Sequence, residues 1–375
     1  METVKILHCA DLHIGAAQFS LGEKGQSRKA EALLTFENII NLARDNEVKI
    51  LLIAGDLLSS NSVSRAAVGR VLECISSVPD IKVVFAAGNH DPMNSESPFT
   101  VLNLPENFYI LPDKDTEIYF PELNTRVFGR SFFDVYMSGE ASFTLKAPED
   151  SINIMCQHGE LKSDLSSNYN SITQEFIENS GMDYIALGHI HKRSDICRAG
   201  NTFYAYSGCA EGLGFDEPGD KGVYIGEVGK GVCDLSFVKT SLRTHETVPV
   251  DVSACEDSAA AAVEAERVLK EKFSDNYTKN LYKIVLKGDV PEGRIYDTAE
   301  IASRLNQTVY FAKVKDETEV LSDLEILRHE NSLKGIFVDK MLLRIAENPD
   351  DSTLKTALNV GLKAFSSEVG YNENQ

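Results

Sequence analysis

The first part of the chain alternates between two patterns of hydrophobic and polar positions. Short apolar runs typical of buried strands occur at residues 4–10, 49–54 and 81–87. Between these runs, residues 24–45 and 64–77 place apolar side chains at helical spacing. This alternation of strand and helix predicts a mixed α/β domain whose first strands are buried.

From residue 108 onward, strand-like segments dominate. They are short, rich in β-branched and aromatic residues, and separated by Pro, Asn and Asp. They lie at residues 108–111, 117–120, 125–128, 152–156, 184–187, 203–206, 222–228 and 233–239. A strand-rich second half joined to an α/β first half predicts an α/β (α+β) fold for this domain.

The pattern changes again at residues 241–247. After it, predicted strands and helices alternate as a small βαβαβ unit, at residues 248–252, 256–273, 281–287, 298–305 and 308–314. Beyond that unit, apolar residues four positions apart predict a helical tail. We therefore expect three parts, at residues 1–245, 246–318 and 319–375.

Charge restricts the classes of function. The 375 residues include 37 Lys and Arg against 57 Asp and Glu, a formal net charge of −20. This balance excludes a protein that grips nucleic acid through a broad basic surface. Apolar residues at 43% and charged residues at 25% are typical of a folded globular protein and exclude a disordered chain.

The cysteines and the lengths of the apolar runs indicate the cellular compartment of the protein. The seven cysteines are scattered without a CxxC pair, which predicts a reducing compartment. The apolar runs are much shorter than the ~20 residues that span a bilayer. The N-terminus also lacks the pattern of a signal peptide. We expect a cytoplasmic protein with no membrane association. The sequence has no GxxxxGK[ST] phosphate loop, so we expect no ATP hydrolysis by this chain.

Residues that bind metals follow five of the predicted strands directly. Loops at the carboxyl ends of strands in α/β sheets gather in one place, so these side chains are expected to converge on one cleft. The candidates are Asp11, His13, Asp56, Asn89, His158, His189 and His191.

The types and number of these residues predict their chemistry. Carboxylates, imidazoles and an amide form a mixed N/O ligand set, which suits Mn²⁺, Fe or Zn²⁺ better than Mg²⁺. Seven ligands are too many for one tetrahedral ion but suit two ions that share a carboxylate. Two ions ~3.5–4 Å apart can clamp a phosphoryl group and lower the pKa of a bound water toward ~7. We predict a centre of two divalent ions, with Mn²⁺ favoured and Fe, Zn²⁺ or Mg²⁺ as alternatives.

In chain order, these segments match the five motifs of a known superfamily. They are Asp11-x-His13, Gly55-Asp56, Gly88-Asn89-His90-Asp91, His158 and Gly188-His189-x-His191. The chain thus resembles the calcineurin-like metallophosphoesterases. Residues 6–15, 55–58, 206–208 and 219–222 make it similar to the bacterial SbcD-like DNA-repair exonucleases. The resemblance implies a metallophosphoesterase β-sandwich flanked by helices, with a small C-terminal α/β cap unit and a helical tail.

The resemblance also implies a role for each residue. Asp11, His13 and His191 would hold one metal, and Asn89, His158 and His189 the other, with Asp56 bridging. His90 would face the scissile phosphate and assist departure of the leaving group, and Asp91 would orient His90. The chain departs from related archaeal and eukaryotic nucleases at Ser59, where they have a histidine.

The function implied is a two-metal DNA exonuclease of DNA repair, cutting 3′ to 5′ with a hydroxide held between the metals. Two alternatives stay open at this point. The same metal pair serves metallophosphoesterases of cyclic nucleotides, nucleotides or phosphoproteins, and a non-catalytic scaffold for an ATPase partner could retain it. The implied partners are DNA, an SMC-like ATPase subunit docking on residues 333–366, and a second copy in a homodimer. No substrate-binding residue is assigned.

Some residues outside the motifs admit two interpretations. Phe132 and Phe133 could stack on bases or end a buried strand. His8 lies within a predicted strand, where packing or support of the ligands is expected. His245 and His329 fit no motif and are expected at the surface.

Overall fold

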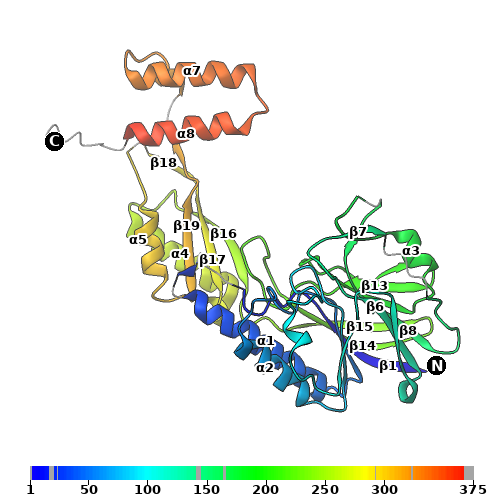
Figure 1. Ribbon diagram of the computed structural model, residues 1–375. Helices are drawn as coiled ribbons and strands as arrows, with labels where there is room; N and C mark the ends of the chain where they lie inside the picture. Colours follow the sequence, from blue (N-terminus) through cyan, green and yellow to red (C-terminus); the bar gives the residue numbers. More distant parts are fainter. Residues whose placement is uncertain are drawn as a thin grey trace. The chain divides into compact units, whose positions relative to one another are not determined.

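The computed structural model describes residues 2–16, 21–22, 24–140, 145–163, 166–291, 293–321 and 324–366. The chain forms two compact units, Met1–Thr244 and His245–Gln375 (Figure 1). The expected three-part division at residues 245 and 318 stays a prediction. The end of the expected tail, residues 367–375, lies outside the described residues.

Two six-stranded sheets make up most of the first unit. The first sheet has the order β15 (Val232–Lys239), β14 (Gly222–Gly229), β1 (Thr3–Cys9), β2 (Ile50–Ile53), β3 (Lys82–Phe85) and β4 (Phe108–Ile110). The second has the order β12 (Cys197–Ala199), β13 (Thr202–Tyr206), β11 (Tyr184–Gly188), β8 (Ile152–His158), β6 (Thr125–Arg130) and β5 (Thr116–Phe120). A third, three-stranded sheet that the sequence did not predict contains β7 (Met137–Glu140), β10 (Tyr169–Ile172) and β9 (Glu160–Leu161).

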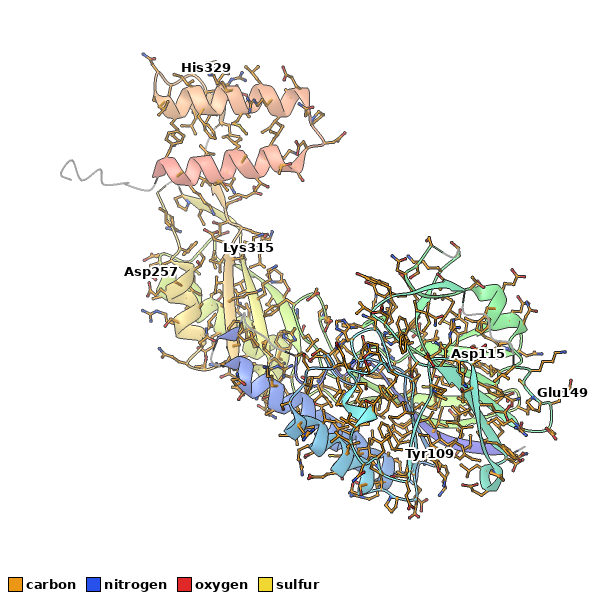
Figure 2. All side chains as sticks on the ribbon, viewed as in Figure 1. Tyr109, Asp115, Glu149, Asp257, Lys315 and His329 are labelled. Atoms are coloured by element: carbon orange, nitrogen blue, oxygen red, sulfur yellow. The ribbon has the colours of Figure 1, made fainter. Side chains whose placement is uncertain are left out.

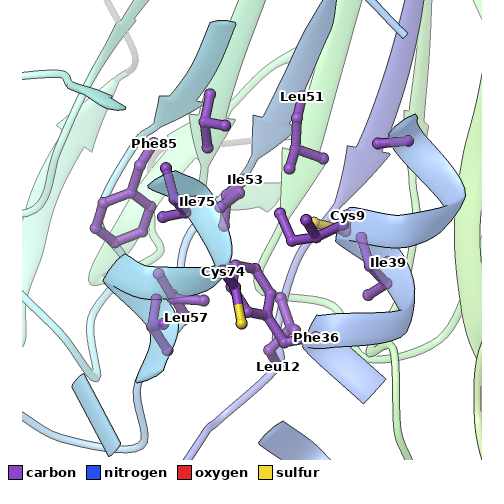
Figure 3. Packing of buried hydrophobic residues seen from close by; sticks show 14 of the residues in the cluster. Cys9, Leu12, Phe36, Ile39, Leu51, Ile53, Leu57, Cys74, Ile75 and Phe85 are labelled. Carbon is purple, nitrogen blue, oxygen red and sulfur yellow. The ribbon is translucent and has the colours of Figure 1, made fainter. Parts of the chain in front are cut away.

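Alternation along the strands explains how the two large sheets pack. On β1, Ile6 contributes to the core that also contains Ile154 of the second sheet, so this core lies between the sheets. The next residue, Leu7, points to the other face and packs in the cluster of Figure 3 with Phe36 of α1 (Lys24–Asp45). Because successive strand side chains point to opposite faces, one strand supplies both cores.

Helices cover both outer faces of this sandwich. Ile75 of α2 (Arg65–Ser76) joins α1 over the first sheet. Ile177 of α3 (Gln174–Asn179) packs against Ile185 on the outer face of the second sheet. The predicted β-sandwich flanked by helices is confirmed.

The second unit contains a parallel three-stranded sheet of β16 (His245–Asp251), β17 (Leu281–Lys287) and β19 (Phe311–Asp316). Its crossovers are α4 (Ser258–Phe273) and α5 (Thr298–Leu305), as the βαβαβ pattern predicts. The short elements β18 (Asp289–Pro291), β20 (Glu319–Leu321) and α6 (Leu324–Leu327) were not predicted. The tail forms α7 (Leu333–Glu347) and α8 (Ser352–Ser366).

Of the two histidines expected at the surface, one is buried. His245 is only 2% exposed rather than at the surface, because it begins β16 and pairs with Leu281 of β17. His329, labelled in Figure 2, is exposed as predicted. Among the described residues, none of the helices combines the length and the apolar composition needed to cross a bilayer.

A buried ion pair fixes α1 against the loop after β13. The guanidinium of Arg28 is inaccessible to solvent and donates to Glu211 and to the Gly212 carbonyl, both at 2.9 Å. The other carboxylate oxygen of Glu211 accepts from Thr35 Oγ1 and from the Leu242 N–H, also at 2.9 Å. Both oxygens of this carboxylate therefore accept hydrogen bonds from protein groups instead of water.

We expect Glu211→Gln to lower the free energy of unfolding by about 2 kcal/mol, because the buried Arg28 keeps its ion pair with Glu31 but loses the second of its two carboxylate partners. Glu73→Gln is the control: Glu73 is exposed, pairs with Arg70 at 2.8 Å, and should change that free energy by less than about 1 kcal/mol. Urea denaturation of both variants measures the difference. Equal losses in the two would contradict the importance of the buried pair.

Candidate metal centre

The candidate ligands stand where parallel strands end. Asp11 and His13 follow β1, Asp56 follows β2, and Asn89 follows β3, and these three strands run parallel in one sheet. His189 follows β11, which runs parallel to β8 in the other sheet. The sequence predicted that β8 ends before His158, but the strand extends to this residue. Parallel strands bring their carboxyl ends to one edge, so ligands from both sheets meet there.

The backbone at these residues is strained. Four of the seven candidate ligands have a left-handed backbone, with φ of 50° at Asp11, 46° at His13, 50° at Asp56 and 99° at His189. Such conformations cost about 1–3 kcal/mol each for residues other than glycine and persist only where the surroundings impose them. Here the Asp11 N–H donates to the Gly55 carbonyl at 3.1 Å, and the His13 N–H donates to the Asp56 carbonyl at 2.9 Å. The two loops therefore hold each other in position.

Two glycines allow the ligand loops to approach this closely. A Cβ atom at Gly55 would lie 2.1 Å from His158 Nδ1, and one at Gly188 would lie 1.7 Å from the Ala54 carbonyl oxygen. Any other residue at either position would push the two sheets apart at the ligand edge.

One group of ligand atoms gathers around His13. Its Nε2 lies 3.0 Å from His191 Nε2 and 3.7 Å from Asp56 Oδ2. Asp11 belongs to the same group, since its carboxylate and the ligand nitrogens of His13 and His191 all lie within 4.8 Å of one another. Two ring nitrogens that face each other beside two carboxylates form a pocket suited to a cation.

A second group gathers around Asn89. Its Oδ1 lies 3.1 Å from His158 Nε2 and 3.2 Å from His189 Nδ1. His158 Nε2 is also 3.6 Å from Asp56 Oδ2. The same carboxylate oxygen of Asp56 therefore approaches both groups. The structure brings all seven candidates together, and the assignment of each ligand to a particular ion stays a prediction.

Hydrogen bonds orient two of the histidines toward the centre. His158 Nδ1 donates to the Ala54 carbonyl at 2.9 Å, which leaves Nε2 free to face Asp56. His191 Nδ1 bonds to the carboxylate of Glu217, which leaves its Nε2 facing His13. Such outer partners fix the ring orientation and tautomer of metal-binding histidines. Sequence reasoning missed Glu217, because only the glycine-rich stretch 208–222 marks this loop.

Burial and neighbouring charges shift the pKa values of the ligands. Burial lowers the pKa of His13 and that of His189 to about 4, so both rings are neutral at pH 7 and can donate a lone pair. Burial raises the pKa of Asp11 to about 6. Burial also opposes a charge on His191, but the hydrogen bond to Glu217 and the nearby carboxylates raise its pKa to about 9.

His90 and Asp91 lie beside the two groups and differ in exposure. His90 is exposed, its ring centroid is 4.8 Å from that of His13, and its backbone N–H donates to Asp56 Oδ1 at 2.9 Å. Asp91 is fully buried, and its two oxygens accept from the backbone N–H groups of Gly88 at 2.8 Å and Leu58 at 2.9 Å. The expectation that Asp91 orients the His90 ring stays a prediction. A buried carboxylate needs donors, and these backbone donors join the two loops.

Two further residues near the ligand loops support the framework. His8 is fully buried between Tyr184 Oη at 2.9 Å and the Leu187 carbonyl at 3.2 Å, as expected for a residue of the core. Burial lowers its pKa to about 3, so the ring is neutral. Ser59, at the position of the histidine found in related nucleases, donates its N–H to the Ile14 carbonyl at 3.0 Å.

Comparison with known proteins agrees with this geometry. The family model of the calcineurin-like phosphoesterases matches residues 4–193, a range that contains all seven candidate ligands. The chain belongs to this family. It is therefore a metallophosphoesterase, a family of hydrolases that bind divalent metals, and the ligand groups described above fit such ions.

The similarity to known proteins extends beyond residues 4–193. The uncharacterized metallophosphoesterase YhaO of Bacillus subtilis is 27% identical over 78% of this chain and 74% of its own length. The DNA double-strand break repair protein Mre11 of Saccharolobus solfataricus is 22% identical over 84% of this chain and 83% of its own. Mre11 of Methanopyrus kandleri is 24% identical over 95% and 82%, respectively. The similarity to SbcD- and Mre11-like metallophosphoesterases inferred from the motifs is confirmed.

We expect Mn²⁺ binding to the metal-free protein to release protons at about pH 7.5, because His191, with a pKa of about 9, must lose its proton to ligate. Asp11, with a pKa of about 6, is mostly ionised at that pH. Metal affinity should therefore rise with pH between about 6 and 9. Calorimetry in buffers of different ionisation enthalpy measures the protons released.

Glu217→Gln removes the carboxylate that raises the pKa of His191, so this variant should release fewer protons at the same pH. Glu73→Gln, on an exposed helix face, should release as many as the wild type. Equal release from all three proteins would show that Glu217 does not hold a proton on His191.

Proposed function

We propose that this metallophosphoesterase hydrolyses phosphodiester bonds in DNA, as a two-metal 3′-to-5′ exonuclease of DNA repair with Mn²⁺ as the favoured ion. The observation that carries the chemistry is the position of Asp56 Oδ2, 3.7 Å from a nitrogen of one ligand group and 3.6 Å from a nitrogen of the other. The names of the Mre11 relatives support DNA as the substrate.

The two groups of ligand atoms indicate which residues would hold each metal ion. Asp11, His13 and His191 would hold one ion, and Asn89, His158 and His189 the other, with Asp56 between them. When bound, such a pair of ions activates a water and neutralises charge on a phosphoryl group. The glycines of the ligand loops let these loops pack closely on one another.

His90 would complete the site from its exposed side. Because its backbone is tied to Asp56 Oδ1, its ring stands beside the ligands without belonging to either group. An imidazole at the solvent side of the centre can give a proton to the departing 3′ oxygen of the cut strand. The buried Asp91 would act indirectly, by joining the loops that carry Asp56 and His90.

Partners follow from the same proposal. The α7 helix exposes the apolar side chains Leu333, Ile336 and Leu343, which repeat at helical spacing and support docking of an SMC-like ATPase subunit on this tail. Such a subunit would supply the grip on DNA that a net charge of −20 does not favour. The homodimer and the cytoplasmic location stay predictions.

In the presence of Mn²⁺, the protein should release nucleotides from the 3′ end of labelled single- or double-stranded DNA. Cyclic nucleotides and a phosphopeptide in parallel reactions test the other metallophosphoesterase substrates. Hydrolysis of these small substrates with DNA left intact would overturn the proposal. Complete inactivity with two ions bound would favour the scaffold.

We expect His90→Ala to keep its metal content and to lose turnover on DNA by about 10²–10⁴-fold, the usual contribution of a general acid. Elemental analysis and initial rates measure the two quantities. His329→Ala, at an exposed histidine of the second unit, is the matched control and should change neither. Loss of metal together with activity in His90→Ala would show that His90 is a ligand instead.

A further inference from the structure

A row of aromatic rings leads outward from the metal centre. The ring of Tyr169 lies against that of the candidate ligand His189, with centroids 4.8 Å apart and planes tilted by 32°. The ring of Tyr136 continues the row, 5.8 Å from that of Tyr169. Tyr169 is half-buried, whereas Tyr136 is 61% exposed, so the row ends in solvent.

The segment that carries Tyr136 is anchored at the centre. Phe132 is fully buried, and its ring meets that of His158 edge to face at 5.5 Å. The Phe132 N–H donates to the Ala87 carbonyl at 3.0 Å, and its carbonyl accepts from the Met93 N–H at 2.7 Å. The sequence allowed two interpretations of residues 132 and 133, which could stack on bases or end a buried strand. The structure buries the first of these and leaves Phe133 56% exposed.

The ligands of the metal centre differ in their exposure to solvent. Asp11, His13, Asp56 and His158 are buried, whereas His189 and His191 are half-buried and His90 is exposed. A phosphodiester must therefore reach the ions past the accessible histidines. Of these histidines, His189 carries Tyr169 on its ring, so a nucleotide that passes His189 would lie next to the aromatic row.

We propose that Tyr136, backed by Tyr169, forms a stacking platform for the base of a nucleotide that flanks the scissile phosphodiester. This inference rests on the proposed function and names the part of the substrate that the chain itself holds. Every base has an aromatic face, so such stacking tolerates any sequence. It also needs no basic surface, so a net charge of −20 does not oppose the stacking of one base.

Replacing a terminal base with an abasic residue tests the platform. We expect the wild type, with Mn²⁺, to lose about 5- to 150-fold in kcat/KM on a single strand whose last nucleotides are abasic, the range of one base stacked on an aromatic ring. Tyr136→Ala should lose a similar factor on normal DNA and little more on the abasic strand. Tyr136→Phe should behave as the wild type because it keeps the ring.

Tyr119→Ala is the matched control, because Tyr119 is 41% exposed on β5 and its ring packs on Arg126 rather than on a ligand. It should cut both strands at the wild-type rate. Equal rates of the wild type on normal and abasic strands would overturn the platform while leaving the exonuclease proposal intact.

A binding measurement decides the same question without cleavage. A strand ending in 2-aminopurine, mixed with EDTA-treated protein, should lose fluorescence as the base stacks, and Tyr136→Ala should abolish this loss. Absence of quenching by the wild type would overturn the platform. Failure of the Mn²⁺-loaded protein to cut any DNA, with quenching retained, would instead refute the exonuclease function alone.

Discussion

The left-handed backbone of the ligand loops is the constraint on which the site depends. Asp11, His13 and Asp56 adopt it directly after strands of the first sheet, and His189 adopts it after a strand of the second. An isolated loop would relax to an extended or right-handed conformation. The sandwich prevents this relaxation, because each loop is held by hydrogen bonds to a neighbouring loop and by close packing at Gly55 and Gly188. The packed core thereby stabilises these strained conformations and fixes the positions of the ligands.

Electrostatics favours a cation in the same place. Asp11 and Asp56 are both buried, and the burial that raises the pKa of Asp11 to about 6 reflects the cost of keeping its charge from water. Neutral His13 and His189 rings supply lone pairs but no positive charge. Divalent ions would compensate the carboxylates locally, so the overall acidity of the chain says little about chemistry at the centre.

The sequence predicts the site well where residue type and strand position act together. All seven ligand candidates come together because each follows or ends a strand, and the order of strands is readable from hydrophobic pattern. Glu217 was not predictable, since its bond to His191 depends on how a long loop folds back. The bonds of Asp91 to two backbone N–H groups were also not predictable, because they depend on burial between two loops distant in the sequence. The strands β7, β9 and β10 were missed because they carry few apolar residues, whereas equally short strands such as β2 and β3 are continuous apolar runs.

The central claim is that ligands from both sheets hold two ions through one shared carboxylate. Crystals grown with Mn²⁺, measured at the manganese absorption edge, test it most directly. The account predicts two anomalous peaks about 3.5–4 Å apart, with Asp56 bound to both and three of the other ligands on each side. A single peak, or two peaks of which only one contacts Asp56, would contradict it.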